Sequence, residues 1–203
     1  MQIFIATGNP GKLKELRESL AEFYPGKFSD VQGRAARDAE ETSETFEGNA
    51  KIKSHALVKE LIAEGHSDFY VLADDSGLVV DELGGAPGVH SARYAGDHVE
   101  PAQHMQKLLA ALKAIPVASR ESNARYVCAL SMIRVLDGRL DREVSSTGTC
   151  EGSISFESAG SSGFGYDPIF WVPHRGCTMA ELRGEEKNEI SHRHDAFRLL
   201  KKL

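Results

Sequence analysis

Two acidic residues interrupt an apolar segment near the middle of the chain, and this interruption limits how the segment can fold. Residues 69–73 form an apolar run of strand length, residues 78–80 form a second run, and the sequence Asp-Asp-Ser-Gly at residues 74–77 stands between them. An isolated carboxylate inside a protein is costly, so such groups pair, accept hydrogen bonds or bind a cation. The segment is therefore either a polar turn between two strands or a carboxylate site within a buried sheet.

The N-terminal segment predicts a strand, a glycine-containing turn and a helix. Residues 2–7 form the strand, residues 8–12 the turn, and apolar residues at helical spacing follow as far as Phe23. This arrangement presents backbone N–H groups and the positive end of a helix dipole to a phosphate, although it is not a Walker A loop and an ordinary turn is the alternative. Lys12 favours the phosphate site, because a cation at a helix start opposes the dipole.

The next segment is polar and is followed by a long helix. Residues 24–45 lack a hydrophobic period and contain an acidic run with Glu41, a pattern typical of a solvated face. Apolar positions then predict a helix over Phe46–Ala63, with a serine or threonine just before it as the N-cap. Asn49 and Lys53 share a face near the start of this helix, where they either line a site or meet solvent.

The second half of the chain predicts antiparallel strands. Residues 125–136 predict the longest strand, and Asp137 with Gly138 predicts a hairpin turn. The chain should then return antiparallel over residues 140–149, with another short strand near residues 153–156. We therefore expect an α/β fold with a mixed sheet flanked by helices and an antiparallel hairpin extension.

Two further features lie toward the C-terminus. Residues 160–168 combine glycines with two aromatic residues, so this loop can either wrap a flat ring or be merely flexible. The last predicted helix has His192 and Arg193 in its first turn and an apolar stripe that ends at Leu203. These cations again oppose the helix dipole unless an anion is present. Two such helix starts, together with the Asp-Asp segment, indicate a polyphosphate with a metal ion.

The composition limits the cellular setting and the partners. A chain of 203 residues, 41% hydrophobic and 27% charged, suits a soluble protein, and we expect a single domain over residues 1–203. No apolar run reaches the roughly 20 residues of a membrane helix, and the N-terminus is typical of a strand, not of a signal peptide. The net charge of −6 argues against a nucleic acid polymer as partner. Three widely spaced cysteines support neither a disulfide framework nor a zinc site, so a cytoplasmic protein without a membrane partner is expected.

The polar residues together predict a nucleotide site. The cations that could neutralise phosphates are Lys12, Lys187, His192 and Arg193. Oxygen ligands suit a hard metal ion such as Mg²⁺, and the candidates are Asp74, Asp75 and Glu41. The aromatic loop could hold a base, but these residues alone do not decide which bond breaks.

The motifs, taken in order, give the chain a specific resemblance. It resembles the Ham1/RdgB family, the inosine/xanthosine triphosphate pyrophosphatases. The matching segments are residues 7–12, 40–42, 73–78, 84–88, 91–94, 163–168, 186–188 and 191–193. Each segment is weak alone, whereas their order along the whole chain is specific. One departure is Ser43, which stands where bacterial members often carry glycine, in the loop that carries Glu41.

The resemblance implies a fold, a reaction and an assembly. The implied fold is an elongated mixed α/β protein with two lobes around a central cleft, and the implied assembly is a homodimer. The implied reaction is the hydrolysis of non-canonical purine nucleoside triphosphates (ITP, dITP and XTP) to the monophosphate and pyrophosphate with Mg²⁺, which removes deaminated purines from the nucleotide pool. A pyrophosphatase of different base specificity and a nucleotide-binding module without turnover are the alternatives.

The resemblance also implies roles for individual residues. Asp75 is implied as the catalytic base and a Mg²⁺ ligand, with Glu41 as a second ligand. Asp74 is either a further ligand or the neighbour that raises the pKa of Asp75, since a free Asp has a pKa of about 3.9 and is a weak base. The implied substrate-binding residues are Thr7, Gly8, Asn9, Pro10, Gly11, Lys12, Ser76, Phe164, Gly165, Tyr166, Asp167, Lys187, His192 and Arg193.

Overall fold

The computed structural model describes residues 1–115 and 122–200 of the chain. These residues form a seven-stranded sheet in the order β2-β1-β3-β4-β5-β6-β7. The contacts divide the chain into two compact units. Unit 1 comprises Met1–Asp75, Cys128–Gly148 and Arg193–Leu203, and unit 2 comprises Ser76–Val127 and Thr149–His192.

Unit 1 is built on parallel strands. Its complete elements are β1 (Gln2–Ala6), α1 (Pro10–Phe23), β2 (Asp30–Arg34) and α2 (Phe46–Ala63). It also contains the first part of β3 (Phe69–Val80) and the hairpin ends of β4 (Ser122–Leu136) and β5 (Arg139–Ile154). All residues of α5 (His192–Leu199) except the first belong to it as well. β1 pairs parallel with both β2 and β3, so that Gln2 stands opposite Asp30 on one side and Phe69 on the other. Residues 3–6 of β1 and residues 69–73 of β3 are apolar and buried on both faces, as strands that are covered on both sides require.

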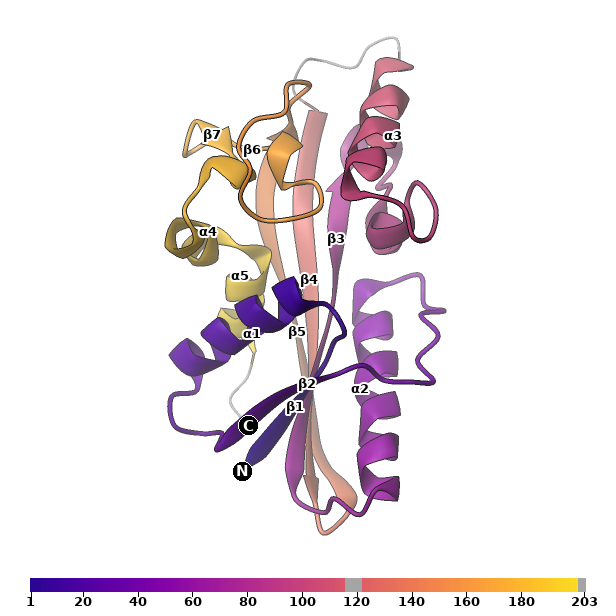
Figure 1. Ribbon diagram of the computed structural model, residues 1–203, viewed down its shortest axis with the longest axis vertical. Coiled ribbons are helices and arrows are strands. Elements are labelled where there is room, and N and C mark those ends of the chain that lie inside the picture. Colours follow the sequence, from indigo (N-terminus) through magenta and orange to yellow (C-terminus); the bar gives the residue numbers. More distant parts are fainter. Residues whose placement is uncertain (116–121, 201–203) are drawn as a thin grey trace. The chain divides into compact units, whose positions relative to one another are not determined.

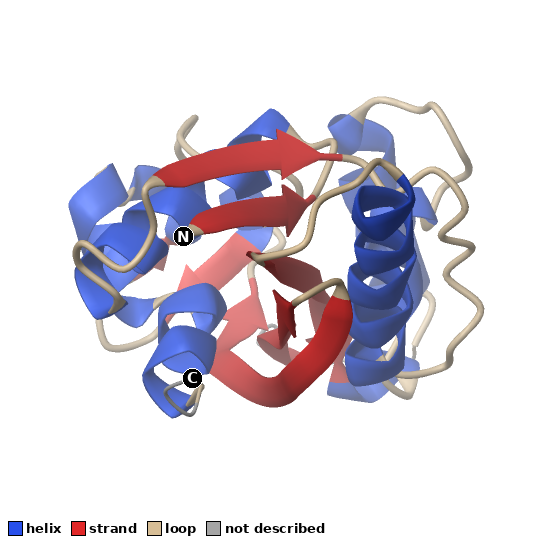
Figure 2. Cartoon of the chain, turned by 90° about the horizontal axis from the view of Figure 1, so that it is seen from below, coloured by secondary structure: helices blue, strands red, loops and turns tan. Residues whose placement is uncertain are grey.

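Helices cover both faces of the unit 1 strands, as Figures 1 and 2 show. On one face, Leu16 of α1 and Phe197 of α5 pack in a buried cluster with Ile5 of β1. On the other face, Leu57 of α2 packs in a separate cluster with Phe4 of β1. Successive residues of a strand point to opposite faces, so neighbouring side chains of β1 and β3 meet different helices.

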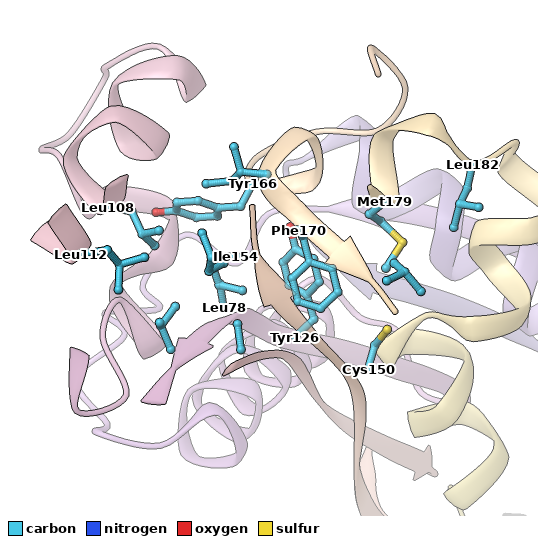
Figure 3. Close-up of a cluster of buried hydrophobic side chains, with 14 residues drawn as sticks. Leu78, Leu108, Leu112, Tyr126, Cys150, Ile154, Tyr166, Phe170, Met179 and Leu182 are labelled. Carbon is cyan, nitrogen blue, oxygen red and sulfur yellow. The ribbon is translucent and has the colours of Figure 1, made fainter. Parts of the chain in front are cut away.

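Unit 2 surrounds a third apolar cluster. Its further elements are η1 (Asp81–Leu83), η2 (Gly88–Arg93), α3 (Pro101–Lys113), η3 (Asp167–Ile169), β6 (Phe170–Val172), β7 (Cys177–Thr178), η4 (Met179–Glu181) and α4 (Gly184–Ile190). β6 pairs antiparallel with β5 and with β7. In Figure 3 the rings of Tyr126 and Phe170 lie together in this cluster, with centroids 4.5 Å apart, and Leu108 and Leu112 of α3 lie near Leu78.

The structure confirms the predicted α/β class, with a mixed sheet flanked by helices and a hairpin. α2 spans Phe46–Ala63 as predicted, and Thr45 caps it by accepting a hydrogen bond from the Gly48 N–H. At the hairpin, Asp137 and Gly138 have φ angles of 49° and 68°, which is the two-residue turn that matches the twist of the flanking strands.

Three features of local structure differ from, or decide between, the expectations from the sequence. Residues 74–77 form no turn, because β3 runs without a break from Phe69 to Val80, so the alternative of carboxylates within a buried sheet holds. β2 lies in the polar segment where no element was predicted, and it is stabilised by its pairing with β1. β5 is one strand as far as Ile154, so residues 140–149 and 153–156 are not separated.

Two sequence predictions can be compared with the structure only within the described residues. The apolar stripe of α5 includes the buried Ala196 and Leu200, but Leu203 lies outside the described residues. Within residues 1–115 and 122–200, no helix is long and apolar enough to cross a membrane.

Candidate active site

Asp74 and Asp75 lie side by side on β3 in unit 1, and both are buried. Because strand side chains alternate, the two carboxylates point to opposite faces of the sheet. Asp74 meets residues of α1 and α5, whereas Asp75 meets residues of α2. The Asp-Asp segment therefore supplies two separate carboxylate sites, one on each face.

On the first face, the Asp74 carboxylate forms ion pairs with two cations. Its Oδ2 lies 3.2 Å from Lys12 Nζ and 3.5 Å from Arg193 Nη2. Arg193, which is 2% exposed, also contacts Glu15, with Nη1 2.6 Å from Oε2. Burial alone would raise the pKa of Asp74, but Lys12 and Arg193 hold that pKa well below its usual range. Asp74 is therefore ionised in the folded protein at neutral pH.

Asp74 explains why cations stand at two helix starts. Lys12 lies in the first turn of α1, and Arg193 lies in the first turn of α5. Sequence reasoning attributed both to a bound polyphosphate, whereas the structure shows that a carboxylate of the chain itself faces both. Asp74 is the carboxylate that contacts Lys12, whereas Arg193 lies closer to Glu15 than to Asp74, so carboxylates of the protein face the cations at both helix starts.

Hydrogen bonds within residues 7–12 hold the predicted phosphate loop in place. Asn9 is the N-cap of α1, and its Oδ1 accepts hydrogen bonds from the N–H groups of Gly11 (2.8 Å) and Lys12 (3.1 Å). The Asn9 N–H donates to Thr7 Oγ1 at 3.1 Å. Residues 10–12 belong to the first turn of the helix and not to a separate turn, whereas Gly8, Asn9 and Pro10 are exposed.

On the second face, Asp75 is held by two side chains of α2. Lys53 Nζ lies 3.0 Å from Asp75 Oδ1, and Asn49 Nδ2 donates to Asp75 Oδ2 at 3.3 Å. Lys53 Nζ also lies 3.3 Å from Glu41 Oε1, so one ammonium group joins two carboxylates. Burial works against the charged form of Lys53, but the carboxylates of Asp74, Asp75 and Glu41 raise its pKa.

The pKa of Asp75 is shifted upward, so this carboxylate accepts a proton more readily than an ordinary Asp. Burial is the largest cause, and the carboxylate of Glu41 adds to it, whereas Lys53 opposes it. Sequence reasoning offered Asp74 as the neighbour that raises the pKa of Asp75. In the structure the like charge that raises it is Glu41, and Asp74 points to the opposite face of the sheet.

Asn49 and Lys53 contact Asp75, so they line a site, which was one of the two alternatives for this face of α2. Glu15 belongs to the Asp74 cluster and was not chosen from the sequence. Glu15 follows Lys12 by three residues and so lies on the same face of α1. Its partner Arg193 comes from the other end of the sequence, and no local pattern gives this contact.

Ser43, the residue that departs from the resemblance, orients Asn49. The Ser43 N–H donates to Asn49 Oδ1 at 2.9 Å, which leaves the amide nitrogen of Asn49 to face Asp75. The Ser43 hydroxyl accepts a hydrogen bond from the N–H of Thr45, the cap of α2. Serine therefore fits the loop that carries Glu41.

Glu41 and Asp75 are the two carboxylates of the second face that could hold a metal ion. Among residues 1–115 and 122–200, no group of three or more His, Cys, Asp and Glu side chains is arranged to hold a metal ion. Mg²⁺, however, usually binds one or two carboxylates and takes its other ligands from water and substrate phosphates. Glu41 and Asp75 fit this description, because the Lys53 ammonium already occupies a cation position between them.

In unit 2, Asp167 organises the glycine-rich loop. Its carboxylate accepts hydrogen bonds from the Phe164 N–H (2.9 Å), the Tyr126 hydroxyl (3.0 Å) and Lys187 Nζ (2.8 Å). Gly163 has a φ of 79°, and a Cβ at this position would collide with Asp167 Oδ2. The loop is therefore held in a defined shape and is not merely flexible.

The two aromatic residues of this loop differ in exposure. Phe164 is 39% exposed, and Lys187 Nζ lies 4.8 Å from the centre of its ring. Tyr166 is buried in the apolar cluster of Figure 3, and its hydroxyl donates to the Ser91 carbonyl at 2.9 Å. Of these two rings, only Phe164 presents a face to a ligand, and Tyr166 anchors the loop.

The remaining predicted residues take different positions. His192 is buried in unit 2, and its ring stacks on Tyr126 with centroids 4.9 Å apart and an angle of 17° between the planes. Through Tyr126 it belongs to the same network as Asp167 and Lys187. Ser76 is half-buried on the unit 2 part of β3, and Gly165 adopts a φ of 63° in open space.

The mixed sheet, the two carboxylate clusters and the ordered aromatic loop define an α/β enzyme suited to a phosphorylated ligand. The chain belongs to the Ham1 family, whose sequence profile matches residues 3–203.

Comparisons with individual proteins agree with this family. The chain is 45% identical over 202 residues to a dITP/XTP pyrophosphatase of Photorhabdus laumondii subsp. laumondii, covering 98% of this chain and 95% of the relative. It is 44% identical over 206 residues to a dITP/XTP pyrophosphatase of Bacillus subtilis, covering 100% of this chain and 96% of the relative. Among solved structures, a HAM1 protein from Coxiella burnetii matches with a TM-score of 0.79 and 36% identity, covering 98% of this chain and 95% of that chain.

Proposed function

We propose that this enzyme hydrolyses ITP, dITP and XTP to the nucleoside monophosphate and pyrophosphate. The names of its relatives support this reaction, since both the Photorhabdus and the Bacillus protein are dITP/XTP pyrophosphatases. The observation that carries the proposal is the environment of Asp75, a buried carboxylate of raised pKa that Lys53 and Asn49 orient. A group of this kind can accept a proton near neutral pH, whereas an ordinary Asp is a weak base.

In the proposed reaction, Asp75 accepts a proton from the attacking water. The water oxygen forms a bond to the α-phosphorus, the bond from that phosphorus to the bridging oxygen breaks, and pyrophosphate leaves with the bonding electrons. Lys12 binds the triphosphate together with residues 7–11, and its ammonium offsets negative charge on the phosphates. Asp74 holds Lys12 in place and is not needed as a metal ligand.

We propose Mg²⁺ as the cofactor, held by Asp75 and Glu41. When bound, the ion would offset phosphate charge and polarise the phosphoryl oxygens. Lys53 contacts both carboxylates and keeps them close together before the ion arrives.

The residues of unit 2 are proposed to bind the base. Phe164 supplies the stacking face, and Asp167 and Lys187 keep the loop in the shape that presents it. Gly165, the next residue, has open space around it. Tyr166 acts indirectly, through its bond to Ser91. His192, Arg193 and Ser76 are the further proposed contacts, with His192 as a donor toward the 6-oxo group that distinguishes hypoxanthine and xanthine from adenine.

A substrate panel tests this function and its alternatives. With Mg²⁺ present, we expect ITP and XTP to release pyrophosphate at least tenfold faster than ATP and GTP, because a mismatched buried polar pair typically costs 1.4 kcal/mol or more, about a factor of ten. Equal rates on all four nucleotides would contradict the base specificity. Binding without release of pyrophosphate would favour a nucleotide-binding module.

We further propose that the protein is a cytoplasmic homodimer in which the chain acts as one domain. The resemblance supports the dimer, and the passage of β3, β4 and β5 through both units supports a single domain. Sedimentation equilibrium should give twice the chain mass of 22.2 kDa, and calorimetry should give one unfolding transition. A monomer mass contradicts the first statement, and two separate transitions contradict the second.

A further inference from the structure

Four charged residues of alternating sign form a row in unit 1: Glu15, Arg193, Asp74 and Lys12. Glu15 Oε2 lies 2.6 Å from Arg193 Nη1, and Arg193 Nη2 lies 3.5 Å from Asp74 Oδ2. The same Oδ2 atom of Asp74 lies 3.2 Å from Lys12 Nζ. The two cations therefore share one oxygen atom of Asp74.

The two end residues of the row, Glu15 and Lys12 of α1, are more exposed than the two residues between them. The side chains of Asp74 and Arg193 are 1% and 2% exposed, whereas those of Glu15 and Lys12 are 15% and 20% exposed. Lys12 is thus the cation of the row that a ligand can reach. Its position depends on Asp74, and Asp74 is also the partner of a fully buried guanidinium.

Glu15 compensates part of the positive charge of Arg193, so Asp74 does not have to compensate all of it. A buried charge needs a compensating partner, and its attraction is strong where water is excluded. The contact of Arg193 with Glu15 is shorter than its contact with Asp74, so Glu15 is the closer of these two carboxylates. If Glu15 lost its charge, Arg193 would draw Asp74 toward itself and away from Lys12.

We propose that Glu15 is a positioning residue for triphosphate binding. Glu15 compensates the charge of Arg193. Asp74 can therefore stay close to the Lys12 ammonium and fix its position at the start of α1. Glu15 acts through Lys12 and does not touch the substrate. This inference rests on the proposed function, in which Lys12 binds the triphosphate.

The substitution E15Q tests the inference, because it removes the charge and keeps the shape. We expect the KM for ITP to rise about tenfold, which corresponds to 1.4 kcal/mol of binding, while kcat stays within twofold. E15D should restore most of the affinity. E18Q is the matched control, since Glu18 lies on the same helix and pairs with the exposed Lys14; it should leave KM unchanged. An unchanged KM for E15Q, or a loss confined to kcat, overturns the inference.

A second pair of variants separates positioning from general destabilisation. In R193M the cation that Glu15 compensates is absent, so E15Q should have no effect on KM when it is added to R193M. The double variant lacks both charges of this pair, so it buries no uncompensated charge from it. The KM values of R193M and E15Q/R193M therefore show whether Glu15 acts through Arg193, even where E15Q alone is unstable. A further tenfold rise in the double variant contradicts the inference.

Calorimetry with inorganic tripolyphosphate distinguishes this inference from the proposed reaction. The parent should bind tripolyphosphate about tenfold more tightly than E15Q, whatever nucleotide the enzyme hydrolyses. If the parent fails to hydrolyse ITP but this difference is found, the reaction is wrong and the role of Glu15 stands. If the parent hydrolyses ITP and E15Q binds tripolyphosphate as the parent does, the role of Glu15 is wrong.

Discussion

Asp74 and Asp75 are identical residues whose environments shift their pKa values in opposite directions. Asp74 faces Lys12 and Arg193, which lower its pKa, whereas burial and Glu41 raise the pKa of Asp75. The alternation of side chains along a strand gives the two carboxylates different contacts, although Lys53 and Lys12 act on both at longer range. One carboxylate is therefore fixed as a structural anion, and the other is suited to accept a proton.

At the residue scale, the structure predicts that D74N destabilises the protein in a pH-dependent manner. The variant removes the carboxylate that Lys12 and the buried Arg193 share, so the free energy of unfolding at pH 7 should fall by about 3 kcal/mol. Because the folded-state pKa of Asp74 is lowered, its stabilisation is present above the unfolded-state pKa of about 3.9 and is lost as the pH falls through the folded-state value. Urea denaturation should show the difference between parent and D74N shrinking below about pH 4.

D75N is the matched control for this experiment. The pKa of Asp75 is raised in the folded state, so its ionised form opposes folding at neutral pH. D75N should therefore match the stability of the parent within about 1 kcal/mol or exceed it. If D75N destabilises the protein as much as D74N, the assignment of opposite environments is wrong.

Sequence reasoning could choose these residues but could not assign their partners. The Asp-Asp pair, Lys12 and Arg193 were recognisable because each violates a local rule, either as a charge in an apolar run or as a cation at a helix start. Their mutual contacts join positions 12, 74 and 193, and such separations leave no local signature. The role of Glu15 depends wholly on these contacts.

At the scale of elements, β3 shows where a composition rule fails. Asp, Ser and Gly in succession favour a turn, yet β3 continues because its neighbours provide partners for the polar side chains. β2 was missed for the opposite reason. It has little apolar character, and its strand conformation comes from its pairing with β1.

The glycine-rich loop allows a prediction at the element scale. G163A should disrupt the loop, because a Cβ there collides with Asp167 Oδ2 and the φ of 79° already strains an L-residue. G165A is the matched control, since Gly165 has a φ of 63° but open space around it. We expect G163A to raise the KM for ITP at least tenfold and G165A to raise it less than threefold, with strain alone costing about 1 kcal/mol. Equal effects of both variants would show that the contact with Asp167 does not shape the loop.

At the scale of the whole molecule, the proposed roles are distributed over the two units. Unit 1 holds both carboxylate clusters and Lys12, and unit 2 holds the Phe164 loop with Asp167 and Lys187. The mixed α/β class and the order of the motifs were predictable from the sequence. The resemblance implied two lobes, whereas the residues at which β3, β4 and β5 pass from one unit to the other depend on tertiary contacts and have no local signal.

The identity of the products tests the central claim most directly. Incubation of the parent enzyme with ITP and Mg²⁺ should yield IMP and pyrophosphate in equal amounts without orthophosphate, and chelation of the metal should abolish the reaction. D75N should still bind ITP but turn it over at least about a hundredfold more slowly, as expected for the loss of a general base. Release of orthophosphate by the parent, or turnover by D75N near the parent rate, would contradict the account.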